Sequence, residues 1–151
     1  MLSDTLTEFL HRIPKMNLHV HIEGTIQLQT LLDIAGKNNY LSELTPRQAE
    51  ILSKGSFAYT DFPGFIDTYS LCANALRAEE DYERIVYEYL TASHRLNVRY
   101  VEIYVSPYDR MRRGLSFQRI MAGGFAGQKR AENETGILSL SSMGERFLER
   151  V

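Results

Sequence analysis

Two histidines separated by a single residue, His19 and His21, are the side chains in this sequence whose spacing could bind a metal ion. They lie in an apolar run, Met16 to Ile22, that predicts a β-strand. Residues i and i+2 of a strand share one face and lie about 7 Å apart, so two imidazoles can converge on one ion. Zinc readily accepts imidazole nitrogen. The spacing is weak evidence taken alone, because 4 histidines in 151 residues can produce it by chance.

The predicted strand has a polar face and an apolar face. The polar face carries Asn17, His19 and His21, and the apolar face, which we expect to pack beneath helices, carries Leu18, Val20 and Ile22. Glu23 and Gly24 follow directly, where the strand must end. Parallel α/β folds bind ligands at this carboxyl edge of the sheet.

The elements that must position these residues alternate between helix and strand. Helical patterns and capping residues predict helices near 4–13, 25–36, 45–55, 61–69, 78–96 and 116–136. A second strand is predicted over 98–105, a short third strand over 137–140, and a last helical turn over 145–151. Three glycines in the 116–136 helix, Gly123, Gly124 and Gly127, predict that this helix is weak. Strands separated by helices indicate a parallel α/β sheet.

Composition excludes several classes of partner. The 17 Lys+Arg and 19 Asp+Glu residues give a net charge of −2, which argues against nucleic acid and anionic membranes. Cys72 is the only cysteine, so no internal disulfide can form and a reducing, cytoplasmic location is expected. The first residues include Asp4 and Glu8 and lack the apolar core of a secretion signal, and no run is long enough to span a membrane.

The string P-K-x-x-L-H-x-H-x-E-G-T resembles the first strand of the adenosine deaminase family, zinc-dependent purine aminohydrolases built on a (β/α)8 barrel. Similarity runs from about residue 13 to residue 136 and includes D-F-P-G-F-I-D-T-Y, N-V-R-Y-V-E-I-Y-V-S-P, R-R-G-L-S-F and R-A-E-N-E-T-G-I. A complete barrel needs about 250 residues. The implied fold class is therefore α/β, the N-terminal part of a TIM-type barrel with two to three strands plus helices. Residues 1–136 would form the deaminase-like part and 137–151 a divergent tail.

The resemblance implies roles for particular residues. His19 and His21 would be ligands of Zn²⁺, and Glu23 would contact the ribose. Gly24 would let the backbone turn close to the ligand. The helix after Asp61 would form a lid over the purine with Phe62, Phe65, Ile66 and Tyr69, although periodicity alone favours a core-facing stripe. No catalytic residue of the family falls in this chain, because its third histidine ligand, aspartate ligand, glutamic acid and water-orienting histidine are expected beyond residue 151.

The implied activity is hydrolytic deamination of adenosine to inosine and ammonia, with the chain truncated and inactive alone. In the family, zinc lowers the pKa of a bound water that attacks the amino-bearing carbon, while a glutamic acid protonates the neighbouring ring nitrogen. The cytidine-deaminase arrangement is excluded, since one cysteine cannot supply its P-C-x-x-C motif. Tyr104 departs from the pattern, because many members carry arginine there.

Several alternatives stay open at this stage. One is deamination of adenine or another N6-substituted purine, because H-I-E-G-T also suits adenine deaminase-like members. Another is a non-catalytic α/β remnant that acts as an interaction module, and a third is a different metal-dependent amidohydrolase. With only part of a barrel, the apolar faces of both main strands should lack neighbours, so self-association through exposed sheet edges is expected.

Overall fold

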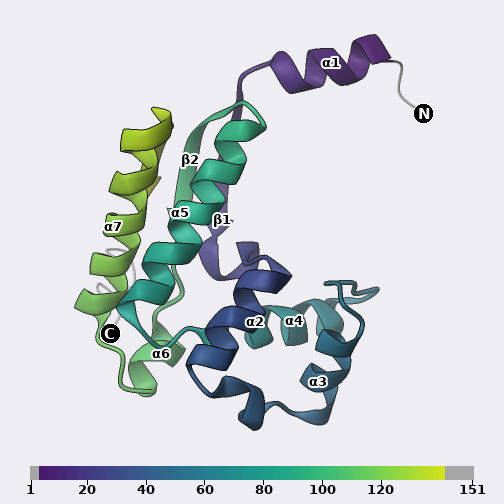
Figure 1. Ribbon diagram of the computed structural model, residues 1–151, viewed down its shortest axis with the longest axis vertical. Coiled ribbons are helices and arrows are strands. Elements are labelled where there is room, and N and C mark those ends of the chain that lie inside the picture. Colours follow the sequence, from purple (N-terminus) through teal and green to yellow (C-terminus); the bar gives the residue numbers. More distant parts are fainter. Residues whose placement is uncertain (1–3, 142–151) are drawn as a thin grey trace.

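Three parallel strands form one sheet in the order β1-β2-β3. The computed structural model in Figure 1 describes residues 4–141. Strand β1 is Lys15–His21, β2 is Val98–Tyr104 and β3 is Leu138–Ser141. The prediction of two main strands and a short third one is confirmed. The helical turn predicted over 145–151 lies outside the described residues.

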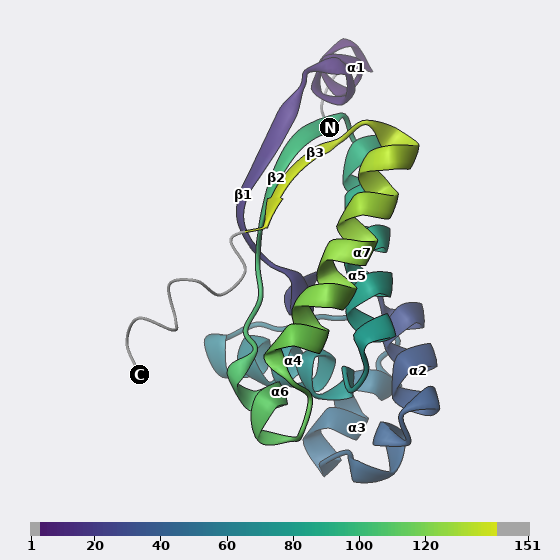
Figure 2. The ribbon, with the colours of Figure 1, turned by 90° about the vertical axis from the view of Figure 1, so that its left-hand side faces the viewer.

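The helices form two groups around this sheet. Their bounds are α1 Asp4–Arg12, α2 Leu28–Lys37, α3 Pro46–Ser53, α4 Phe62–Ala75, α5 Glu79–Arg95, α6 Tyr108–Arg112 and α7 Phe117–Thr135, with short 3-10 turns η1 Ile22–Thr25 and η2 Tyr40–Glu43. Helices α5 and α7 lie along one face of the sheet, and α2, α3 and α4 gather beyond the end of β1 (Figures 1 and 2). No helix within residues 4–141 is long and apolar enough to cross a bilayer.

Local sequence signals account for where these helices begin. Thr45 accepts a hydrogen bond from the Gln48 backbone N–H while the Gln48 side chain accepts one from Thr45, which completes a capping box at α3. Asp61 caps α4 by accepting from the Gly64 N–H at 2.8 Å. Both caps satisfy backbone donors that no helical carbonyl can reach.

The apolar face of β2 is covered, contrary to expectation. Val101 and Ile103 of β2, and Val105 just after it, are all buried in the main core. Helices α5 and α7 cover one face of the sheet (Figure 2). Helices that connect parallel strands cross over on one side, so this side is complete with only three strands. The uncovered face is the opposite one, where the part of the chain that the structure describes places no helix.

The glycines of α7 do not interrupt the helix. Helix α7 is continuous over 19 residues, and Gly123 and Gly127 lie directly against the backbone of α5. A Cβ on Gly123 would lie 2.1 Å from the Glu79 carbonyl oxygen, and one on Gly127 would lie 2.3 Å from that of Glu83. The helix therefore compensates for its low propensity by allowing two backbones to approach more closely than side chains would permit.

The buried carboxylate of Asp81 joins the start of α5 to the end of α2. Its Oδ1 accepts from Lys37 Nζ at 2.6 Å, and its Oδ2 accepts from Asn38 Nδ2 at 2.7 Å and from the Arg77 and Ala78 N–H groups, both at 2.9 Å. Asp81→Asn replaces one carboxylate oxygen with an NH2 group, which would face the N–H donors that now bind this oxygen. We expect a loss of about 2 kcal/mol in the free energy of unfolding.

Urea denaturation of the chain and the variant measures this loss. Glu80→Gln is the matched control, because Glu80 is an exposed carboxylate one position away. It should change the free energy of unfolding by no more than about 0.5 kcal/mol. Equal stability of Asp81→Asn and the unsubstituted chain would contradict the role of Asp81.

Candidate metal and ligand site

Strand β1 contains a bulge at its histidines. The register with β2 shifts between Asn17 and Val20, and His19 has a left-handed backbone with φ of 61°. A bulge adds one residue and reverses the alternation of side chains. The predicted faces are therefore wrong at the start of the strand. Asn17 points toward the helices and donates to the Tyr89 hydroxyl at 2.9 Å, whereas Leu18 is 56% exposed on the open face.

After the bulge, the two histidines do share a face as predicted. The ring centroids of His19 and His21 are 5.2 Å apart, and both side chains are exposed on the open side of the sheet. Val20 packs against the core on the other side, and Ile22 is fully buried in η1. The histidine pair therefore lies at the carboxyl end of β1, on the open face.

Tyr104 joins the two histidines in a cluster of three rings. It pairs with His21 across β1 and β2, and its ring stacks on His19 with centroids 4.0 Å apart and planes 19° apart. Its centroid is 6.1 Å from that of His21. Stacked aromatic pairs contribute about 0.5–1.5 kcal/mol beyond burial. Partial burial and then the neighbouring charge of His19 lower the pKa of His21, which favours the neutral, metal-binding form of the ring.

The donor set fits half of a zinc site. Two imidazoles converge on one surface, and the Ser106 Oγ lies 3.4 Å from His21 Nδ1, where it can orient that ring. Within residues 4–141, no third histidine, cysteine or carboxylate joins them in a group able to hold a metal ion. A catalytic zinc site has three protein ligands and one open position. This part of the chain can therefore supply two of those ligands.

Glu23 follows the histidine strand in η1 and is almost completely buried, with 1% exposure. Its Oε1 accepts from the Ser106 N–H at 2.7 Å, and the Tyr69 hydroxyl donates to its Oε2 at 3.3 Å. Burial raises the pKa of Glu23, and the Ser106 N–H opposes this most strongly. Burial, followed by the charge of Glu23, raises the pKa of Tyr69 to about 12. Glu23 therefore connects η1, α4 and the end of β2.

The aromatic residues of α4 form a row beside this buried carboxylate, in which Phe62 and Phe65 are exposed and Tyr69 is half-buried. Neighbouring ring centroids are 6.1 Å apart for Phe62 and Phe65 and 6.4 Å apart for Phe65 and Tyr69. Ile66 is also exposed, so most of this stripe does not face the core. Gly24 lies against Tyr69, where an added Cβ would lie 3.6 Å from the ring. The structure thus places Glu23, Gly24 and the aromatic row together near the end of β1.

Two residues of this region were not predicted from the sequence. Tyr59 extends the aromatic row, with its ring centroid 5.2 Å from that of Phe65. Ser106 links Glu23 and Tyr69 to His21, with its Oγ 3.1 Å from the Tyr69 hydroxyl. The available signals were an aromatic residue just before the Asp61 cap and a serine directly after a parallel strand, a position that often contacts ligands.

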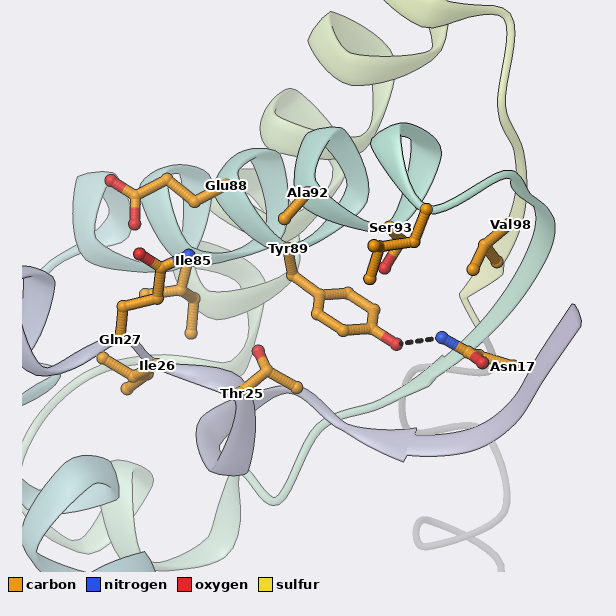
Figure 3. Close-up of a pocket in the computed structure, with 11 residues that line it drawn as sticks. Asn17, Thr25, Ile26, Gln27, Ile85, Glu88, Tyr89, Ala92, Ser93 and Val98 are labelled. Carbon is orange, nitrogen blue, oxygen red and sulfur yellow. Dashed lines mark hydrogen bonds between the residues drawn. The ribbon is translucent and has the colours of Figure 1, made fainter. Parts of the chain in front are cut away.

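A pocket of about 210 Å³ lies on the other side of β1, between the strand and α5 (Figure 3). Its lining includes Asn17 and Tyr89, which are hydrogen-bonded to each other, together with Glu88 and Ser93. Neither His19 nor His21 lines it. The candidate metal site therefore lies on the open face and not in this pocket.

Comparison with known sequences identifies the family. The sequence pattern of the family described as adenosine deaminase matches residues 14–146, a span that contains all three strands. The chain belongs to the adenosine deaminase family. An adenine deaminase of Gibberella zeae is 32% identical over 139 residues, which cover 91% of this chain and 39% of that protein. An aminodeoxyfutalosine deaminase of Acidothermus cellulolyticus is 35% identical over 126 residues, 83% of this chain and 35% of that protein.

Solved structures show the same fold. Adenine deaminase from Arthrobacter aurescens is similar with a TM-score of 0.73 and 25% identity, covering 86% of this chain and 39% of that chain. An amidohydrolase from Burkholderia ambifaria, solved with bound zinc, has a TM-score of 0.79 at 24% identity and covers 93% of this chain and 38% of that one. The chain thus spans about 39% of the length of the adenine deaminases it matches, as the N-terminal part of a TIM-type barrel.

Proposed function

We propose that this chain forms the N-terminal part of a zinc-dependent deaminase of 6-aminopurines, with free adenine as the favoured substrate. The observation that carries the proposal is the histidine pair at the carboxyl end of β1. Its ring centroids are 5.2 Å apart, and Ser106 links His21 to the buried Glu23. Membership of the adenosine deaminase family supports it. The names of similar adenine deaminases support the choice of base.

Each group has a distinct role in this proposal. His19 and His21 would hold Zn²⁺ through imidazole nitrogen, and the bound ion would supply the acidity that hydrolysis of a C–N bond requires near neutral pH. The aromatic row of α4 provides flat apolar faces that can cover a purine and exclude water. The remaining ligands and the acid–base groups would come from the rest of a complete barrel.

The state of Glu23 favours a free base over a nucleoside. A carboxylate that reads a ribose must have an accessible oxygen to accept a hydroxyl hydrogen bond. Glu23 is buried, and each of its oxygens already accepts a hydrogen bond from Ser106 or Tyr69. Adenosine remains the alternative substrate, and it would require Glu23 to exchange one of these partners for the sugar.

The metal assignment predicts weak zinc binding that depends on both histidines. Zinc titration of the purified chain by calorimetry should show one weak site, because two imidazoles fall short of a complete site. Both His19→Ala and His21→Ala should abolish it, whereas His11→Ala on α1 should not. We expect no ammonia release from adenine or adenosine by this chain alone. Tight binding that survives His21→Ala would contradict the assignment.

The substrate assignment is tested at Glu23 in an intact deaminase that carries this N-terminal sequence. Glu23→Gln should lower kcat/KM for adenine and adenosine by similar factors, because the side chain supports the site through Ser106 and Tyr69. Steady-state ammonia assays on both substrates measure the two factors. A loss confined to adenosine would place Glu23 at the ribose and favour the nucleoside.

A further inference from the structure

His19 and His21 differ in what orients their rings. Histidines that bind metals are usually held by a hydrogen bond to their second ring nitrogen, which sets the direction of the first. His21 has such a neighbour in Ser106, whose Oγ lies 3.4 Å from its Nδ1. Among residues 4–141, the His19 ring makes no hydrogen bond, although its backbone is in the left-handed conformation of the bulge. The protein contacts that can orient this ring are therefore its contacts with other rings.

Tyr104 is placed to do this. Its ring stacks on His19 at a centroid distance of 4.0 Å and an interplanar angle of 19°. The flanking residues Ile103 and Val105 are buried in the core, so the backbone that carries Tyr104 is firmly held. The Tyr104 ring therefore covers one face of the His19 ring and is placed to restrict its rotation.

We propose that Tyr104 is a positioning residue that orients His19 for metal binding; this inference rests on the zinc site proposed above. An imidazole that binds zinc carries part of the positive charge of the ion, and the face of a tyrosine ring is electronegative. The stack therefore becomes stronger when the metal is bound. The ring face, not the hydroxyl, provides this effect.

Zinc titration of the full 151-residue chain, in competition with a chromophoric chelator, tests the proposal. Tyr104→Leu should weaken zinc binding by about 10-fold, the lower end of the effect of losing a residue that orients a ligand. Tyr104→Phe keeps the ring face and should retain most of the affinity. Proton NMR of the metal-free chain gives a second measurement, because stacking shifts the His19 ring signals upfield. That shift should persist in Tyr104→Phe and disappear in Tyr104→Leu.

The outcomes separate this inference from the metal assignment. If His19→Ala abolishes zinc binding but Tyr104→Leu binds as tightly as the unsubstituted chain, the positioning role is wrong and the metal site stands. If His19→Ala leaves zinc binding unchanged, the metal assignment fails and this proposal fails with it. If circular dichroism shows that Tyr104→Leu is misfolded, Tyr104→Val takes its place. Loss of the upfield shift and of zinc affinity in folded Tyr104→Val supports the proposal, and retention of both overturns it. An equal loss of affinity in Tyr104→Phe would also contradict it, because that variant keeps the stack.

Discussion

Gly127→Ala is expected to lower the free energy of unfolding by about 3 kcal/mol, at the upper end of the usual cost of overpacking. The new Cβ would lie 2.3 Å from the Glu83 carbonyl oxygen and 3.1 Å from the Tyr87 nitrogen. Both atoms belong to the backbone of α5, so no side chain can rotate away to relieve the overlap. Relief requires α7 to move off α5, which would open the core beneath both helices.

Gly36→Ala is the matched control for this effect. Gly36 also lies within a helix, α2, but nothing lies within 4 Å of the position that its Cβ would occupy. Here the higher helix propensity of alanine should raise the free energy of unfolding by about 0.5 kcal/mol. Urea denaturation of both variants measures the contrast. Similar changes of the same sign in the two would show that α5 and α7 are not packed as described.

The second large effect concerns the open face of the sheet, where we expect one copy of the chain to associate with another. Leu138 and Leu140 are 67% and 55% exposed on β3, and Leu18 is exposed beside the histidines. Large exposed apolar side chains on an open sheet promote association, and lysine on an edge strand prevents it. Replacing Leu138 and Leu140 by lysine should therefore convert an associated chain into a monomer of about 17.4 kDa.

Light scattering coupled to gel filtration, with a chelator present to exclude bridging by metal, measures this change. Leu41→Lys is the control, because Leu41 is 44% exposed in η2 and away from the sheet. It should leave the mass of the associated species unchanged. A monodisperse mass of 17.4 kDa for the unsubstituted chain at all concentrations would contradict the expectation. The sheet face would then remain exposed without driving association.

The local elements of this protein were largely predictable from the sequence. The capping residues Thr45 and Asp61, the periodicity of α5 and the β-branched run of β2 each act over a few neighbouring residues. The H-x-H spacing also acts over a short range, since His19 and His21 lie two residues apart on one strand. These features depend on short-range geometry, which a window of sequence contains.

The details of the candidate site depend on contacts that no such window contains. The bulge at His19 is a relation between β1 and β2, and the Glu23–Ser106 hydrogen bond joins residues 83 positions apart. The stacking of Tyr104 on His19 likewise requires the two strands to be aligned. The close packing of Gly127 on α5 overrides the low helix propensity of glycine, because packing between helices outweighs a local cost of about 1 kcal/mol. Residue types thus specified which groups could perform chemistry, and alignment of distant segments set which of them meet.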